Sequence, residues 1–216
     1  REAANMKIYL FRHGETDWNK QRRLQGQSDV PLNAFGIELA EKTARALEQE
    51  GTVFDRAFSS PLSRALETAR ILSGGRDIPL ETDSRLIEMN FGAYEGSAFD
   101  PPKKEPSHPL HNFLCRPECY VPAEGAESFD EVGARAGAFL REKIMPLEGS
   151  CDTVLVTAHG AFNRCLLRAI SSAPLEDFWK VGLPNCAVSV LSLQNGCFEI
   201  LEMSRIYYDT PVNVRP

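Results

Sequence analysis

The feature that most constrains this chain is a short apolar run that ends in an arginine and a histidine. Residues 6–11 read Met-Lys-Ile-Tyr-Leu-Phe, which is typical of a central strand covered on both faces. Arg12 and His13 follow at its carboxyl end, and Gly14 then allows a sharp turn close to a ligand. An imidazole can attack a phosphoryl group and a guanidinium can hold its oxygens. A solvated Arg and a carbonyl-bonded His would be the commoner explanation of an isolated Arg-His-Gly.

A second cation follows a second predicted strand. Residues 55–59 are expected to form this strand, and Ser60 with Pro61 has the pattern of an N-cap and first helical position. The helix is predicted to end near Leu72, with Arg64 in its first turns. A cation near a helix N-terminus opposes the helix dipole unless an anion lies there. Arg64 is therefore a candidate for anion binding.

A second His-Gly pair follows a third strand. Residues 153–157 are apolar at their centre, and His159 and Gly160 lie just beyond them. Strands that alternate with helices indicate an α/β fold. We predict a three-layer sandwich with a mainly parallel central sheet flanked by helices. Ligands of such sheets bind beyond the carboxyl ends of the strands, where these side chains would meet.

The remaining elements follow from caps and turns. Residues 16–31 are expected to be a long loop, and residues 97–125, with their prolines, an irregular flap rather than helix or strand. The other expected elements are a helix at 34–49 capped by Asn33, a strand at 78–80, a helix from a Ser128 and Glu131 capping box through 144, a helix at 162–170, a short helix after Pro174, and a hairpin of 187–193 with 198–203 around Asn195-Gly196.

Two further segments hold candidate functional residues. Glu88 lies between Ile87 and Met89, and apolar neighbours of this kind favour the protonated carboxyl group that a general acid needs. An ion-paired loop carboxylate is the alternative. Four side chains of the flap could line the rim of a substrate site or could simply pack or be solvated: His108, His111, Phe113 and Tyr120.

Composition limits the class of protein. The 216 residues, of which 43% are hydrophobic, suit one domain over 6–216, with 1–5 expected to be a remnant of expression or a disordered arm. A net charge of −6 argues against a nucleic-acid binder, and no apolar run reaches the roughly 20 residues that span a bilayer. The six cysteines lack a C-x-x-C pair or zinc-site spacing, which favours reduced thiols and a cytoplasmic protein without a metal. The hairpin could leave a sheet edge free to pair in a homodimer.

Four blocks in this order resemble the histidine phosphatase superfamily, also called the phosphoglycerate mutase-like family. They are Arg12 to Glu15, Ser59 to Ala65, Glu88 before Phe91-Gly92, and Ala158 to Gly160. Details of the loops look more like the small phosphatase branch, which includes α-ribazole phosphatase and broad-specificity phosphatases. Two positions depart from that branch: Ala161 replaces a frequent second Gly, and Asn33 replaces Thr or Ser.

The resemblance implies a role for each matching residue. His13 would be the nucleophile that becomes phosphohistidine, and Glu88 would protonate the leaving oxygen. Arg12, Arg64 and His159 would surround the phosphoryl group. Further contacts to phosphate or substrate would come from Asn19, Gln25, Gly26 and Gly160. The resemblance implies no cofactor and a small phosphorylated metabolite as the substrate.

Three functions remain open from the sequence. The first is a metal-independent phosphatase that hydrolyses small phosphomonoesters through phospho-His13. The second is a 2,3-bisphosphoglycerate-dependent phosphoglycerate mutase, and the segment after Gly96 looks too short for the longer cap of such mutases. The third is a non-catalytic binder of phosphorylated ligands, which would need neither a nucleophile nor an acid. The sequence does not identify the physiological substrate.

Overall fold

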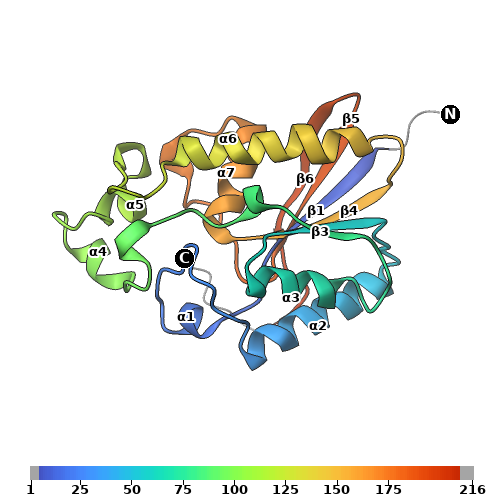
Figure 1. Ribbon diagram of the computed structural model, residues 1–216, viewed down its shortest axis with the longest axis horizontal. Coiled ribbons are helices and arrows are strands. Elements are labelled where there is room, and N and C mark those ends of the chain that lie inside the picture. Colours follow the sequence, from blue (N-terminus) through green and yellow to red (C-terminus); the bar gives the residue numbers. More distant parts are fainter. Residues whose placement is uncertain (1–4, 210–216) are drawn as a thin grey trace.

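A six-stranded sheet with helices on both faces forms the centre of the molecule (Figure 1). The computed structural model describes residues 5–209, so the prediction for 1–4 lies outside the described residues. The spatial order of the strands is β3-β2-β4-β1-β5-β6. Their bounds are β1 Met6–Arg12, β2 Arg56–Ser59, β3 Leu80–Thr82, β4 Thr153–Ala158, β5 Val188–Gln194 and β6 Cys197–Arg205.

The first four strands are parallel, and the last two form an antiparallel extension. β1 and β2 both pair in parallel with β4, and β3 pairs in parallel with β2. β5 is antiparallel to β1 and to β6. The turn between β5 and β6 has φ values of 52° at Asn195 and 73° at Gly196, which the Asn-Gly pattern predicts. The α/β class, the mainly parallel sheet and the hairpin are therefore confirmed.

Seven α-helices within the described residues cover the sheet and its carboxyl edge. In Figure 1, α2 and α3 cover one face and α6 and α7 the other, while α4 and α5 lie together at one end. Their bounds are α1 Asp17–Lys20, α2 Ala34–Gln49, α3 Ser63–Leu72, α4 Asp100–Lys104, α5 His111–Cys115, α6 Phe129–Phe139 and α7 Gly160–Ser171. None of the helices in residues 5–209 has both the length and the apolar character that a bilayer span requires.

Alternate residues of the central strands pack on opposite faces of the sheet. Val154 and Val156 belong to the core under α6 and α7, whereas Leu155 packs with Leu47 and Leu72 of α2 and α3. This arrangement explains why the strands are apolar almost throughout. Both layers of helices are thereby fixed to the strands whose ends form the site.

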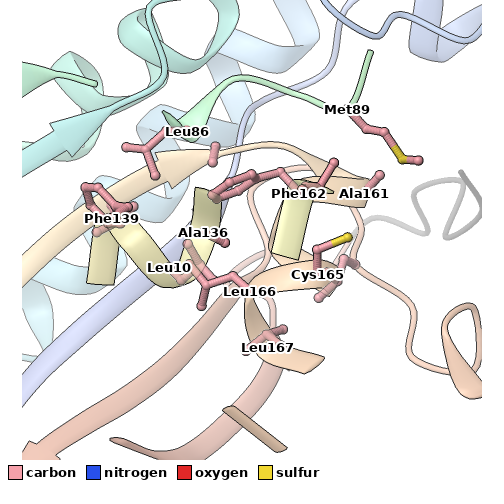
Figure 2. Packing of buried hydrophobic residues seen from close by; sticks show 14 of the residues in the cluster. Leu10, Leu86, Met89, Ala136, Phe139, Ala161, Phe162, Cys165, Leu166 and Leu167 are labelled. Carbon is pink, nitrogen blue, oxygen red and sulfur yellow. The ribbon is translucent and has the colours of Figure 1, made fainter. Parts of the chain in front are cut away.

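The helix that follows β4 is held by the largest core. Figure 2 shows Phe162 and Leu166 of α7 among Ala136 and Phe139 of α6, with Leu10 of β1 nearby. Each of these five side chains is at most 2% exposed. The start of α7, which lies beside the predicted catalytic residues, is consequently anchored against the sheet.

Three boundary predictions are wrong, each for a local reason. The loop at 16–31 contains α1, because Thr16 and Asn19 form a capping box. The flap contains α4 and α5, and α4 accommodates prolines in its first turn, where a missing N–H costs nothing. Ser60 is not the N-cap of α3; that residue is Leu62, which has no side-chain cap bond. The caps at Asn33 and Ser128 are confirmed.

Candidate active site

Residues from the ends of three parallel strands meet at one edge of the sheet. Arg12 ends β1 and His13 follows it, Ser60 follows β2, and His159 follows β4. The rings of His13 and His159 lie with their centroids 5.2 Å apart. Both histidines are buried, with 2% and 0% of their surface exposed. The two His-Gly segments therefore meet, as the topology of the sheet requires.

The hydrogen bond of His13 fixes which of its nitrogens is available. Nδ1 lies 2.6 Å from the carbonyl oxygen of Gly14. A carbonyl can only accept, so Nδ1 carries the proton and donates. In the neutral ring, Nε2 then holds the free lone pair. Nε2 is therefore the atom with which the imidazole can attack as a nucleophile.

The electrostatic surroundings keep both histidines neutral. Burial, then the positive charges of Arg64 and Arg12, holds the pKa of His13 well below its usual value. Burial and Arg64 likewise lower the pKa of His159. A neutral His13 at physiological pH can act as a nucleophile without first losing a proton.

Two buried guanidiniums flank the histidines. Arg12 Nη1 donates to Leu183 O at 2.6 Å, and Arg64 donates to Ser28 O and Gly26 O at 2.6 and 2.7 Å. The Nε atoms of both arginines are buried without a hydrogen-bond partner in the described chain. Burial lowers the pKa of Arg64 to about 10, with partial compensation from Glu88, so it remains positive at neutral pH. Carbonyl oxygens hold each arginine in place. The Nε–H group of each is still available to donate a hydrogen bond to an anion.

His159 is positioned by a serine that the sequence did not single out for this role. Ser60 Oγ lies 2.8 Å from His159 Nε2, and both residues are fully buried. His159 Nδ1 is buried without a partner in the described chain. The hydroxyl of Ser60, which also accepts from the N–H group of Leu62 at 3.3 Å, therefore links the start of α3 to the imidazole.

Glu88 lies at the N-terminus of α7. The sequence predicted apolar surroundings for its carboxyl group, but backbone N–H groups contact it instead. Its Oε1 accepts from the N–H groups of Met89 and Phe162 at 2.8 Å each, and its Oε2 accepts from Ala161 at 3.1 Å. The first turn of a helix has N–H groups that lack partners within the helix. Two such donors, together with the N–H group of Met89, orient the carboxyl group of Glu88, a residue that is 8% exposed.

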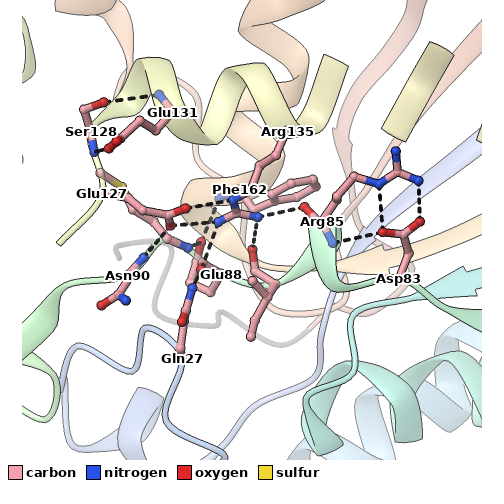
Figure 3. Close-up of polar contacts among 12 residues, drawn as sticks. Gln27, Asp83, Arg85, Glu88, Asn90, Glu127, Ser128, Glu131, Arg135 and Phe162 are labelled. Carbon is pink, nitrogen blue, oxygen red and sulfur yellow. Dashed lines mark hydrogen bonds and ion pairs between the residues drawn. The ribbon is translucent and has the colours of Figure 1, made fainter. Parts of the chain in front are cut away.

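The segment that carries Glu88 is braced by Arg135 of α6, as Figure 3 shows. Arg135 donates to three carbonyls, those of Arg85, Ile87 and Glu88, at 2.6 to 3.1 Å. It also contacts both carboxylate oxygens of Glu127, at 2.9 and 3.0 Å. A bidentate pair of this kind fixes geometry as well as charge. Helix α6 therefore sets the position of Glu88 through its backbone.

A single cavity brings most of the predicted residues together. The predicted residues that line it are Arg12, His13, Asn19, Gln25, Gly26, Arg64, Glu88 and Gly160. His159 is not among the residues that line the cavity, but its ring lies next to that of His13, which does line it. The Thr16 hydroxyl, which has one proton to donate, lies 2.7 Å from Gln25 Oε1 and 3.1 Å from Asn19 Oδ1, and so links the loop to the site.

Only one of the four rim candidates lines this cavity. Phe113 does so, and its ring stacks with or abuts those of several neighbours. Tyr120 packs against Phe113 with ring centroids 5.3 Å apart. His108 Nδ1 accepts from Leu110 N at 3.1 Å, and His111 Nδ1 lies 2.8 Å from Pro102 O. The two histidines thus stabilise the flap from within.

Sequence reasoning missed several residues of the cavity, above all Arg164. Arg164 is 5% exposed, and the central carbon of its guanidinium lies 4.7 Å from the centre of the Trp179 ring. Residues four apart share one face of a helix, so the spacing from Gly160 could have placed Arg164 over the His-Gly segment. The other missed residues that line the cavity are Arg23, Leu24, Phe91, Phe99, Ala161 and Trp179.

The comparison with known proteins agrees with this geometry. The family model of the histidine phosphatase superfamily (branch 1) matches residues 8–205. The chain belongs to the histidine phosphatase superfamily. The resemblance predicted from the four sequence blocks is thereby confirmed, and the superfamily comprises enzymes, both phosphatases and mutases.

Three proteins illustrate what this chain is similar to. It is 34% identical over 189 residues to the probable phosphoglycerate mutase GpmB of Yersinia pestis (strain Pestoides F), covering 88% of this chain and 86% of that protein. Bacillus stearothermophilus YhfR has a TM-score of 0.84 and 32% identity, with 93% and 98% of the chains covered. The phosphoserine phosphatase of Entamoeba histolytica, in complex with 3-phosphoglyceric acid, has a TM-score of 0.79 and 26% identity, with 93% and 97% covered.

Proposed function

We propose that this chain is a phosphatase that hydrolyses small phosphomonoesters through a phosphohistidine on His13, without a metal ion. The observation that carries the proposal is a set of buried nitrogens without partners in the described chain: Arg12 Nε, Arg64 Nε and His159 Nδ1. Buried polar atoms rarely remain unpaired, so their presence around one imidazole favours an anion at that place. A similar protein, the Entamoeba enzyme, is named as a phosphatase.

The first half of the reaction transfers the phosphoryl group to the protein. His13 Nε2 attacks phosphorus while the bond to the alcohol oxygen breaks, and the departing oxygen takes a proton from Glu88. Charge on the equatorial oxygens is stabilised by Arg12, Arg64 and His159. Phosphoryl transfer depends mainly on alignment and on such charge stabilisation, which guanidiniums can supply in place of a metal ion.

The second half returns the protein to its initial state. The Glu88 carboxylate takes a proton from water as the water oxygen attacks phosphorus. The bond from phosphorus to Nε2 breaks, and inorganic phosphate leaves with His13 neutral again. Glu88 acts as acid in one half and base in the other, and the reaction is split into two easier displacements.

The test is hydrolysis of p-nitrophenyl phosphate in the presence of EDTA. We expect turnover by the wild type and a fall of about 10³-fold or more for His13→Ala, as when other enzymes lose a nucleophile. His108→Ala, outside the cavity, should retain activity. Full activity of His13→Ala, or loss of wild-type turnover in EDTA, would contradict the proposal. Alkaline quenching of a labelled ester should trap label on His13, which also separates an enzyme from a mere binder.

A phosphoglycerate mutase is the second candidate, because the Yersinia relative carries that name. The two reactions share phospho-His13 and differ in what accepts the phosphoryl group, water or a phosphoglycerate. Interconversion of 3- and 2-phosphoglycerate after priming with 2,3-bisphosphoglycerate would favour the mutase. Phosphate release without that interconversion would exclude the mutase and support the phosphatase.

A further inference from the structure

A short loop, residues 26–28, fixes the guanidinium of Arg64. Arg64 Nη1 donates to Ser28 O at 2.6 Å, and Nη2 donates to Gly26 O at 2.7 Å. A guanidinium is planar and rigid, so two bonds from its terminal nitrogens also set the direction of its Nε–H group. That group is buried without a partner in the described chain. The position of the 26–28 loop therefore decides where Arg64 can donate to a phosphoryl oxygen.

The same loop contacts the backbone of Glu88. Gln27 Nε2 donates to Glu88 O at 3.1 Å, and this carbonyl also accepts from Arg135 of α6 (Figure 3). The 26–28 loop thus joins the segment of the proposed general acid to the guanidinium of Arg64. A displacement of the loop would act on both groups.

Glu95 anchors the 26–28 loop through two hydrogen bonds. Its Oε1 accepts from Gln27 N and its Oε2 accepts from Ser28 Oγ, each at 2.8 Å. A Cβ added to Gly26 would overlap the same carboxylate, so Glu95 lies directly against the loop. Hydrogen bonds to a carboxylate are about twice as strong as those between neutral groups. One side chain therefore fixes the loop along its whole length.

Glu95 itself has no part in the proposed phosphoryl chemistry. It is not among the residues that line the cavity. Both of its carboxylate oxygens accept from the 26–28 loop, so the carboxylate is directed at the loop and not at the ester. A residue placed in this way can influence the reaction only through the groups that the loop holds.

We propose that Glu95 is a positioning residue for Arg64: it holds the 26–28 loop, whose carbonyls direct the guanidinium at the phosphoryl group. This inference rests on the proposed phosphatase activity. Donors that are already oriented stabilise the charge that develops in the transition state. A misdirected Arg64 should therefore lower kcat more than it raises KM.

The test is a double-mutant cycle between Glu95→Ala and Arg64→Gln. The readout is kcat and KM for hydrolysis of p-nitrophenyl phosphate in EDTA. Glu95→Ala alone should lower kcat by about 10-fold to 100-fold, with a change in KM of less than about 3-fold, because it removes two hydrogen bonds to a charged group. In Arg64→Gln, which lacks the guanidinium, the same substitution should lower kcat by less than about 3-fold, since residues that act as a unit are not additive.

Three further variants separate positioning from folding. Glu95→Gln keeps an oxygen that can accept from Gln27 N, so it should recover part of the lost kcat. Glu124→Ala is the matched control, because this glutamate is exposed, and it should keep the wild-type kcat. Ser28→Ala removes one of the two bonds to Glu95 and keeps the carbonyl that accepts from Arg64, so it takes the place of Glu95→Ala in the cycle if that variant does not fold.

The cycle can contradict the role of Glu95 in three ways. An equal fall in kcat in the wild-type and Arg64→Gln backgrounds would show that Glu95 does not act through Arg64. An unchanged kcat with a lower free energy of unfolding in urea would leave Glu95 a structural role alone. A rise in KM without a fall in kcat would assign it to substrate binding. No hydrolysis by the wild type would instead refute the phosphatase, and this inference with it.

Discussion

Glu88 Oε1 accepts a 2.8 Å hydrogen bond from the backbone N–H of Phe162, and this bond joins the two halves of the site. Glu88 belongs to the segment braced by α6, while Phe162 lies in the first turn of α7, directly after the His159-Gly160 pair. The carboxyl group is therefore oriented by the same helix start that follows His159, one of the residues proposed to bind the phosphoryl group. Its position and that of His159 cannot change independently.

Glu88→Gln should impair esters with poor leaving groups most. A general acid contributes about 10²-fold to 10⁴-fold when the leaving oxygen needs a proton. We expect a loss in that range for an alkyl phosphate and a much smaller loss for p-nitrophenyl phosphate, whose phenolate leaves without help. Glu131→Gln is the control, since glutamine also completes the capping box at Ser128. Equal losses for both esters would show that Glu88 acts only by position.

Ser60→Ala should lower kcat with little effect on KM. The change leaves His159 Nε2 buried without its partner at 2.8 Å. An unpaired buried polar group costs roughly 1–3 kcal/mol, which corresponds to a fall of about 5-fold to 150-fold in kcat if the imidazole tilts away. Ser59→Ala is the matched control, because Ser59 is as deeply buried but donates to Ser60 O. Steady-state kinetics of the two variants decide whether the serine positions the histidine.

The strand-end residues could be placed from sequence because each follows an apolar run that is easily recognised. Arg12, His13 and His159 then meet by topology alone, since the carboxyl ends of parallel strands lie at one edge. The position of Arg64 could be predicted because it lies in the first turn of α3, the helix that follows β2. The part of the site at the strand ends was therefore predictable before any contact was known.

The supporting residues were not predictable in this way. Ser60 has the pattern of a helix cap, and only the approach of β4 reveals that its hydroxyl contacts His159. Arg135 looks like a solvated position on an amphipathic helix, yet it is directed inward against carbonyls of a distant segment. Such contacts depend on how helices pack on the sheet, and local patterns carry no information about that packing.

Acid should destabilise the protein through its two buried histidines. The folded state holds the pKa of His13 and His159 well below the unfolded value of 6.5. The unfolded state therefore binds more protons below about pH 6.5, and stability falls as the pH drops. From about pH 7.5 to about pH 5.5, each histidine that stays neutral when folded should cost about 1.4 kcal/mol.

Urea unfolding of the wild type and of His159→Gln at the two pH values measures this effect. The variant should lose about 1.4 kcal/mol less than the wild type on acidification. His108→Gln, a change in the flap, should behave like the wild type. An equal loss in the wild type and His159→Gln would mean that carboxyl groups or other sites dominate acid unfolding.

Gly26→Ala should weaken substrate binding as well as stability. Gly26 has φ of 52°, and an added Cβ would collide with the Glu95 carboxylate, which holds Gln27 N and Ser28 Oγ at 2.8 Å each. The displaced loop would also move the Gly26 carbonyl that accepts from Arg64.

Gly51→Ala is the matched control. Gly51 also has a positive φ, but an added Cβ would meet open space, so the substitution should cost only the conformational penalty, about 1–2 kcal/mol. Gly26→Ala should cost about 1–3 kcal/mol more and raise KM, because overpacking adds to the same penalty. Equal unfolding free energies and an unchanged KM would show that the loop yields without disturbing Arg64.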